Sequence, residues 1–157
     1  MVDLVKLSWI IAAPLLGAVV NGLWTLSAAR NKRTPRRLPI AILATVAAFV
    51  SFFFSIICFK NILSLPPESR FIEQTLFNWI SVGDFHVPIA LRLDPLSAIM
   101  ILVVTGVGSL IHLYSIGYMS HDVGQGRFFV YLNMFLTAML TLVLASNLPL
   151  MFVGWEG

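Results

Sequence analysis

The sequence predicts an all-α integral membrane protein with four transmembrane helices, the start of a fifth and an outer-side β-hairpin loop. Hydrophobic residues make up 59% of the 157 residues, 11% are charged, and the mean hydropathy is +0.92. These values lie outside the range of water-soluble domains. In addition, four uncharged stretches are each long enough to cross about 30 Å of hydrocarbon as a helix. We therefore interpret residues 1–157 as a single membrane domain.

Charges, Pro or Gly bound each hydrophobic stretch, and the predicted spans are about 8–29, 38–59, 95–117 and 128–147. Asn147 and Pro149 interrupt the last hydrophobic run, and Pro is tolerated in the first turn of a new helix. We therefore expect a partial fifth helix over 149–157. Because so short a helix cannot span a bilayer, we expect another polypeptide, or a continuation of the chain, to supply the later helices. The alternative is that this segment stays at the membrane surface.

The distribution of basic residues predicts the orientation of the chain. Five of the ten Lys and Arg residues lie in segment 30–37, a pattern typical of cytoplasmic loops rather than of nucleic-acid binding. We expect this loop to be cytoplasmic, and the N-terminus and loop 60–93 to lie outside. A cleaved signal peptide over 1–29 is the alternative, but its apolar run is too long and the basic segment after it opposes export.

The outer loop contains two segments rich in β-branched and aromatic residues, 76–82 and 85–93. The pair Gly83-Asp84 between them suits a type II′ hairpin turn. Apolar and other residues alternate after this turn, which predicts one buried and one exposed face: Val87, Ile89, Leu91 and Leu93 against His86, Pro88, Ala90 and Arg92. Pro88 favours an edge strand. We expect the hairpin to cover the outer surface and to contact a neighbouring protein.

Glu156 is the main candidate for a functional residue. It follows 28 positions, 128–155, without a formal charge. A charged side chain near the centre of a membrane helix costs roughly 2.5 to 3.5 kcal/mol on insertion scales, so such residues are rare and mostly functional. We predict that Glu156 carries protons. The alternative is a carboxylate that reaches back to the membrane interface.

Three predicted spans carry small or polar residues at helical spacing: Gly17, Asn21, Thr25 and Ala28; Thr105, Ser109, His112 and Ser115; Asn133, Thr137, Thr141 and Ala145. Such stripes indicate close helix packing with interhelical hydrogen bonds, or the lining of a hydrated proton path. His112 is a second candidate site residue. An imidazole inside a span could relay protons, or could hydrogen-bond a neighbouring helix.

The sequence gives no reason to expect a cofactor or a metal in this chain. Cys58 is the one cysteine, and the three histidines have no spacing suited to a metal, haem or iron–sulfur site.

Several motifs resemble the antiporter-like L subunit of NADH:quinone oxidoreductase, complex I, which is its chain 5. They are Leu91-Arg-Leu-Asp-Pro-Leu-Ser97, Val104-Thr-Gly-Val-Gly108, Ile111-His-Leu-Tyr-Ser115, Gly117-Tyr-Met119, Arg127-Phe-Phe and Gly154-Trp-Glu-Gly157, with Asn133 and the hairpin Ser81-Val-Gly-Asp-Phe85. The resemblance covers the chain from residue 76 onward by motif, and the first two spans by pattern. It corresponds to the N-terminal portion of a longer subunit.

The resemblance implies a proton pump module without a redox centre, driven by quinone reduction elsewhere in the complex. It implies enzyme activity at the level of the complex, with flavin, iron–sulfur clusters and quinone in other subunits. The acid that matches Glu156 pairs in that family with a lysine on a later helix, and the predicted spans here contain no lysine. Ser146 stands where the family commonly has Asp.

The expected partners are other membrane-arm subunits and the lipid bilayer, and the expected location is a bacterial plasma membrane. Two alternative functions remain open at this point. One is a component of a multisubunit cation/proton antiporter, because that family shares the ancestry. The other is a truncated, non-catalytic membrane scaffold.

Overall fold

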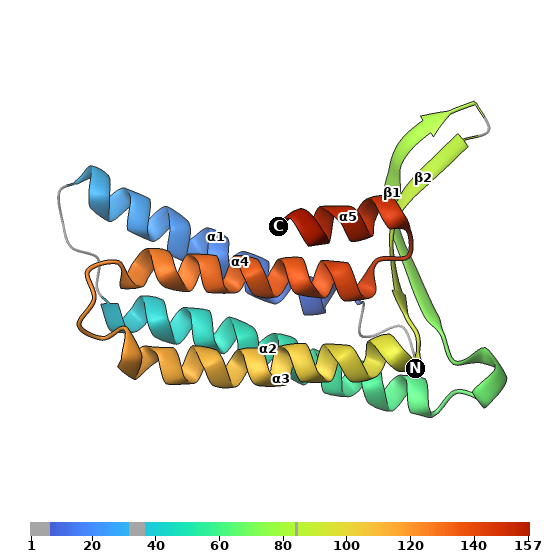
Figure 1. Cartoon of the computed structure of the whole chain (residues 1–157), viewed down its shortest axis with the longest axis horizontal. Helices are drawn as coiled ribbons and strands as arrows, with labels where there is room; N and C mark the ends of the chain where they lie inside the picture. The colour runs from blue at the N-terminus through green and yellow to red at the C-terminus, as the bar shows by residue number, and fades with distance from the viewer. Residues whose placement is uncertain (1–6, 32–36, 84) are drawn as a thin grey trace.

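The computed structural model of the chain describes residues 7–31, 37–83 and 85–157. Four long helices run side by side: α1 (Ser8–Arg30), α2 (Arg37–Leu63), α3 (Pro95–Tyr118) and α4 (Gln125–Leu144) (Figure 1). Each is long and apolar enough to cross a membrane. The predicted all-α membrane fold is therefore confirmed. The N-terminus, most of the basic loop and Asp84 lie outside the described residues, so the orientation of the chain stays a prediction.

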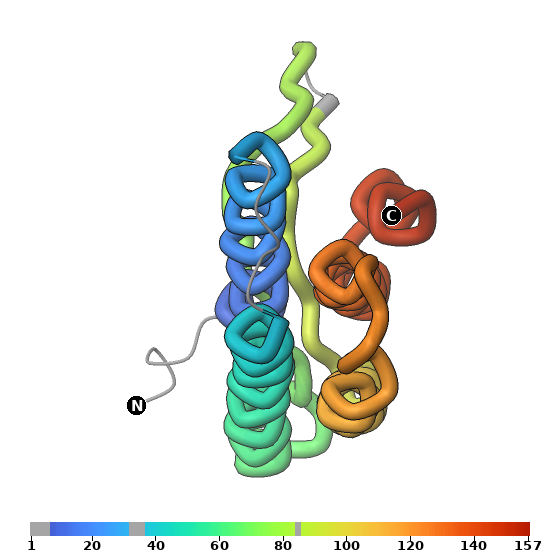
Figure 2. The backbone as a smooth tube through the Cα atoms, turned by 90° about the vertical axis from the view of Figure 1, so that its left-hand side faces the viewer, coloured from blue at the N-terminus to red at the C-terminus, as the bar shows by residue number. Residues whose placement is uncertain are grey.

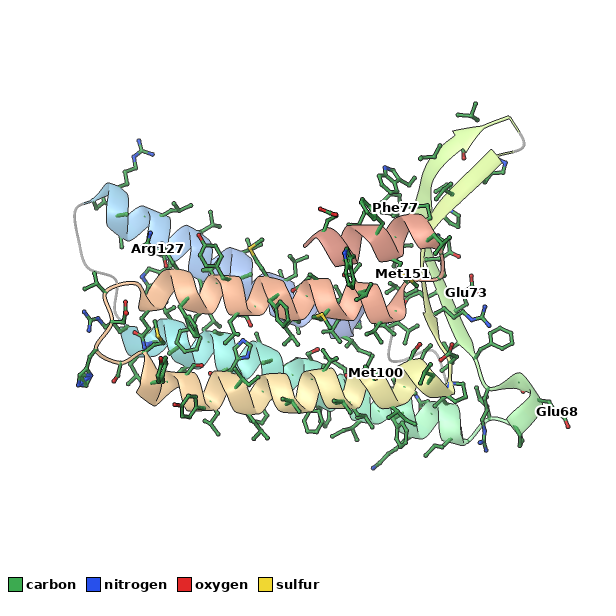
Figure 3. All side chains as sticks on the ribbon, in the orientation of Figure 1. Glu68, Glu73, Phe77, Met100, Arg127 and Met151 are labelled. Carbon is green, nitrogen blue, oxygen red and sulfur yellow. The ribbon has the colours of Figure 1, made fainter. Side chains whose placement is uncertain are left out.

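The helices form two layers, with α1 beside α2 and α3 beside α4, as the end-on view in Figure 2 shows. A short fifth helix, α5 (Leu148–Glu156), packs against α4 and stops about halfway along the bundle (Figure 1). Charged residues occur at both ends of the bundle. Arg127 lies at the end where α1 and α3 finish, here called the loop end, and Glu68 and Glu73 lie at the opposite hairpin end (Figure 3).

Two helices differ by more than one residue from the bounds of the predicted spans. Helix α4 begins at Gln125 and ends at Leu144, three residues earlier than expected at each end. The early end is explained by residues 145–147, which leave the helix and associate with the hairpin. Helix α2 continues to Leu63, so Lys60 lies in its last turn rather than in the loop.

Pro14 lies inside α1 and removes one backbone donor from the helix. The acceptor that loses its usual donor is the carbonyl four residues earlier, on Ile10. The hydroxyl of Ser51 on α2 donates a hydrogen bond to that carbonyl at 2.6 Å. An unpaired carbonyl in hydrocarbon costs several kcal/mol. Ser51 therefore allows the proline and joins the first two helices.

The loop between α2 and α3 contains a short 3-10 helix, η1 (Pro67–Ser69), and the antiparallel strands β1 (Ile72–Val82) and β2 (Phe85–Leu93). The predicted hairpin is confirmed, although β1 begins four residues earlier than expected. Gly83 has φ +57°, a conformation that suits the first position of a primed turn. The specific turn type stays a prediction because Asp84 is not described.

The predicted alternation along β2 is confirmed in part, because Ile89 and Pro88, expected on opposite faces, are both half-buried. Val87, Leu91 and Leu93 are buried, and His86 and Arg92 are exposed. Ala90 was expected on the exposed face but is 0% exposed. The turn between α4 and α5 covers it, because Ser146 N–H donates to the Ala90 carbonyl at 3.1 Å and Ala145 pairs with Leu91. The free edge of β2 is thus partly closed by this turn.

Asn147 connects the hairpin to the start of α5. Its Oδ1 accepts from the Leu150 N–H at 3.0 Å, which caps α5, and its Nδ2 donates to the Pro88 carbonyl at 2.7 Å. Pro149 lies in the first turn of α5, as predicted. Polar side chains also hold the starts of α3 and α1. Asp94 caps α3 through the Ser97 N–H, and Gln74 on β1 bonds Ser8 of α1.

We predict that Asn147→Ala destabilises the folded protein by roughly 2 kcal/mol, because it removes a helix cap and a side-chain hydrogen bond, each contributing about 1 kcal/mol. Asn147→Ser is the matched control. Its hydroxyl oxygen can still cap α5 at the Leu150 N–H, and it lacks the amide donor to the Pro88 carbonyl, so about half of the loss is expected. Unfolding of the purified protein in mild detergent measures both values. Equal losses in the two variants would contradict the double role of Asn147.

Candidate functional site

His112 on α3 and Asn133 on α4 form a polar pair in the centre of the bundle. His112 is 1% exposed and Asn133 is 0% exposed. The imidazole Nε2 lies 2.9 Å from Asn133 Oδ1, and Nδ1 lies 2.7 Å from the Gly108 carbonyl oxygen, one turn earlier on α3. Both ring nitrogens therefore have polar partners. The apolar ring of Phe129 lies beside the imidazole, with 6.4 Å between the ring centroids.

The second polar atom of the Asn133 amide faces α1. Nδ2 is buried and has no hydrogen-bond partner among the described residues. It lies against Gly17, where an added Cβ would be only 2.7 Å from Nδ2 and 2.8 Å from the Ala47 Cβ. A side chain at position 17 would thus require Asn133 or α2 to move. Three helices, α1, α3 and α4, meet at this Gly17–His112–Asn133 junction.

The polar stripes of the sequence are mostly buried in the bundle. Thr105, Ser109, His112 and Ser115 of α3 are all buried, as are Gly17 and Asn21 of α1. Most of the hydroxyls donate to a carbonyl one turn earlier in their own helix, as Thr137 and Thr141 do at 2.8 and 2.9 Å. Close packing of the stripes is therefore observed, and their hydration stays a prediction.

Glu156 is the last residue of α5 and is exposed on the surface of the bundle. Its neighbour Trp155 is 74% exposed. Counted from Leu148 at about 1.5 Å per residue, Glu156 lies roughly 12 Å from the hairpin end, whereas His112 lies roughly 25 Å from it along α3. The structure therefore places the two predicted site residues at different depths and does not bring them together.

Gly154 brings α5 into contact with the backbone of α4. A Cβ added at Gly154 would lie 2.5 Å from Leu142 N and 2.9 Å from the Ala138 carbonyl oxygen. Two clefts of about 210 Å³ each flank this contact, and Gly154 and Gly157 line both. Thr137 and Thr141 line the cleft between α1, α4 and α5. Glu156 therefore lies two residues after Gly154, the residue at which α5 contacts the backbone of α4.

We predict that Gly154→Ala separates α5 from α4, because the clash is with backbone atoms that cannot rotate away. Overpacking of this kind costs typically 1 to 3 kcal/mol. Amide hydrogen exchange of α5 should become faster. Gly117→Ala is the control, since an added Cβ there meets nothing within 4 Å. Amide hydrogen exchange of α5 should be unchanged in this variant. Equal protection of α5 in the two variants would show that Gly154 does not set its position.

Sequence reasoning missed the pairing of His112 with Asn133, the hairpin contact of Asn147 and the close approach at Gly154. Each residue was part of a noted stripe or motif, but the partner lies on another helix or on the hairpin. The described residues contain no group of three His, Cys, Asp or Glu side chains that could hold a metal ion.

The structure defines the class of protein as a polytopic membrane protein, in which a hairpin closes one end of a four-helix bundle and a short helix carries an acid back along it. The family model described as NADH-Ubiquinone oxidoreductase (complex I), chain 5 N-terminus, matches residues 79–129. This range contains the turn of the hairpin, α3 and the start of α4.

Relatives extend the match over most of the chain. It is 44% identical over 116 residues to NADH-quinone oxidoreductase subunit L of Mycobacterium tuberculosis (strain ATCC 25618 / H37Rv), which is 74% of this chain and 18% of that protein. The subunit L of Escherichia coli (strain K12) is 46% identical over 112 residues, 71% of this chain and 17% of that protein. That of Rhodobacter capsulatus is 41% identical over 156 residues, 94% of this chain and 20% of that protein.

These matches confirm the resemblance seen in the sequence. The chain is a relative of subunit L, chain 5 of complex I, and corresponds to the N-terminal portion of that family. It spans about a fifth of the length of the curated relatives it matches.

Proposed function

We propose that this chain is a proton-translocating part of the membrane arm of an NADH:quinone oxidoreductase, and that Glu156 carries the proton. The observation that carries the proposal is the placement of Glu156 on a helix that turns back along the membrane-spanning α4. The likeness to subunit L over most of the chain supports the same function. The enzyme activity belongs to the whole complex, with flavin, iron–sulfur clusters and quinone in other subunits.

The exposure of Glu156 on the described bundle indicates that the proposed site needs a further protein component. A carboxylate at this depth is costly if lipid surrounds it. We infer that protein outside the described bundle covers it, and the clefts beside Gly154 and Gly157 border the same surface. A basic side chain from another membrane-arm segment would stabilise the charged carboxylate, and its withdrawal would favour protonation. Such alternation allows Glu156 to accept and release a proton.

The proposed location is a bacterial plasma membrane, because the three relatives described above are bacterial proteins. The cytoplasmic loop 30–37 and the outside N-terminus remain part of this proposal. The cation/proton antiporter and the non-catalytic scaffold are the other functions considered from the sequence. No contact among the described residues favours either of them.

We predict that Glu156→Gln lowers the number of protons pumped per electron, because glutamine cannot take up a proton, whereas oxidation of NADH elsewhere in the complex continues. Glu156→Asp should keep most of the pumping, since it retains a carboxyl group. Glu73→Gln, at an exposed site at the hairpin end, is the matched control and should have no effect. Proton uptake and NADH oxidation in membrane vesicles measure the ratio. An unchanged ratio in Glu156→Gln would overturn the role of Glu156.

A further inference from the structure

We propose that Asn133 is a positioning residue for His112, whose carboxamide turns by half a rotation when Nε2 of His112 gains or loses a proton. This inference concerns the buried junction of α1, α3 and α4. Its link to proton transport rests on the proposed function, whereas the coupled rotation follows from the hydrogen-bond geometry alone.

The first step concerns Nδ1 of His112. Nδ1 lies 2.7 Å from the Gly108 carbonyl oxygen, which can only accept a hydrogen bond. A deprotonated Nδ1 would place two lone pairs against each other at that distance. Nδ1 therefore carries a hydrogen in both charge states of the ring. It cannot pass this proton on through the carbonyl, so protons must enter and leave the ring at Nε2.

The second step concerns Nε2 and the Asn133 amide. In the neutral ring with hydrogen on Nδ1, Nε2 has a lone pair and accepts, so Asn133 must present its NH₂ group. In the charged ring, Nε2 carries a hydrogen and donates, so Asn133 must present Oδ1. The two amide orientations have nearly the same shape and differ in hydrogen bonding. Each protonation state of His112 thus selects one orientation of Asn133.

The third step concerns the space beside α1. The amide atom that faces Gly17 is Nδ2, and it has no hydrogen-bond partner among the described residues. A half rotation of the amide would place Oδ1 at the same position, beside the same glycine. The amide therefore has no second hydrogen bond that would hold it in one orientation. The contact with His112 alone decides between the two. Gly17 leaves the space that the Asn133 amide occupies, because any Cβ there would collide with the amide.

No charged side chain on the described parts of the packed helices hydrogen-bonds to His112 or Asn133. Between their end residues the described parts of α1, α2, α3 and α4 contain no Asp, Glu, Lys or Arg apart from Lys60, in the last turn of α2, and Arg127. Lys60 is at the hairpin end and Arg127 at the loop end (Figure 3). The other titratable side chains on these helices are the buried Cys58 and the exposed Tyr114, Tyr118 and Tyr131. Asn133 is therefore the polar side chain that bonds Nε2.

Nitrogen NMR of the membrane-embedded protein tests this inference. The chain is labelled with ¹⁵N in histidine and asparagine side chains and measured in the assembly that contains it, with His112→Gln used to assign the signals. In the neutral state, the spectrum should show hydrogen on Nδ1 and none on Nε2. On acidification, Nε2 should gain a hydrogen while the Asn133 amide nitrogen loses its bond to the ring. Hydrogen on Nε2 in the neutral state would overturn the proposal.

Two variants separate positioning from simple packing. Asn133→Asp presents only acceptors, so His112 should be doubly protonated at a pH where the natural protein holds the neutral ring. Asn133→Leu keeps a similar volume but offers no hydrogen-bond acceptor to Nε2. The doubly protonated ring therefore loses its partner, and His112 should stay neutral on acidification. If neither variant changes the protonation of His112 while both still fold, Asn133 merely fills space and the proposal fails.

Proton pumping in the same Asn133→Leu protein tests the link to transport. A lower proton-to-electron ratio, together with the NMR result, supports a role of the junction in transport. An unchanged ratio overturns that role. Failure of the proposed function is distinguishable, because it would appear as normal pumping in Glu156→Gln, whereas the NMR test of the Asn133 rotation does not depend on Glu156.

Discussion

The constraint on which this structure depends is that backbone polar groups in hydrocarbon must be satisfied within the protein, because no water is available there. The hydroxyl of Ser51 bonds the carbonyl that Pro14 leaves without its usual donor. At the hairpin end, Asn147 satisfies both the start of α5 and a carbonyl of the proline-containing strand β2. The bonds of Ser51 to Ile10 and of Asn147 to Pro88 do more than satisfy single atoms, because each joins segments far apart in the sequence and fixes how they meet.

The position of Glu156 follows from these bonds. The free edge of β2 at Ala90 and Leu91 holds residues 145–147 in an extended conformation, which ends α4 and turns the chain. Asn147 then starts α5 in the direction of the loop end, and Gly154 lets α5 lie against the backbone of α4. A hairpin outside the helical bundle thus determines the depth at which the acid is placed.

The sequence predicted the features that depend on local pattern. Hydropathy and length were enough for four spans, Pro149 for the start of α5, and Gly83 for the turn of the hairpin. It could not predict the end of α4, because Leu144 and Ala145 are equally suited to a helix and only pairing with β2 separates them. The sequence likewise placed His112 and Asn133 only on two separate stripes. Their contact depends on which turn of α3 packs against which turn of α4, and neither stripe alone determines this.

Distance limits how strongly His112 and Glu156 influence each other. They differ in depth by roughly 13 Å, counted along helices that both start at the hairpin end. At an effective dielectric constant of about 20, two unit charges this far apart interact by at most about 1.3 kcal/mol, or roughly a tenfold change in a protonation equilibrium. Direct electrostatic coupling is thus weak. A proton on His112 acts mainly through its hydrogen bond to Asn133 on α4, and α4 is the helix against which Gly154 holds α5. Communication between the two sites therefore requires a movement of α4, rather than a field between two charges.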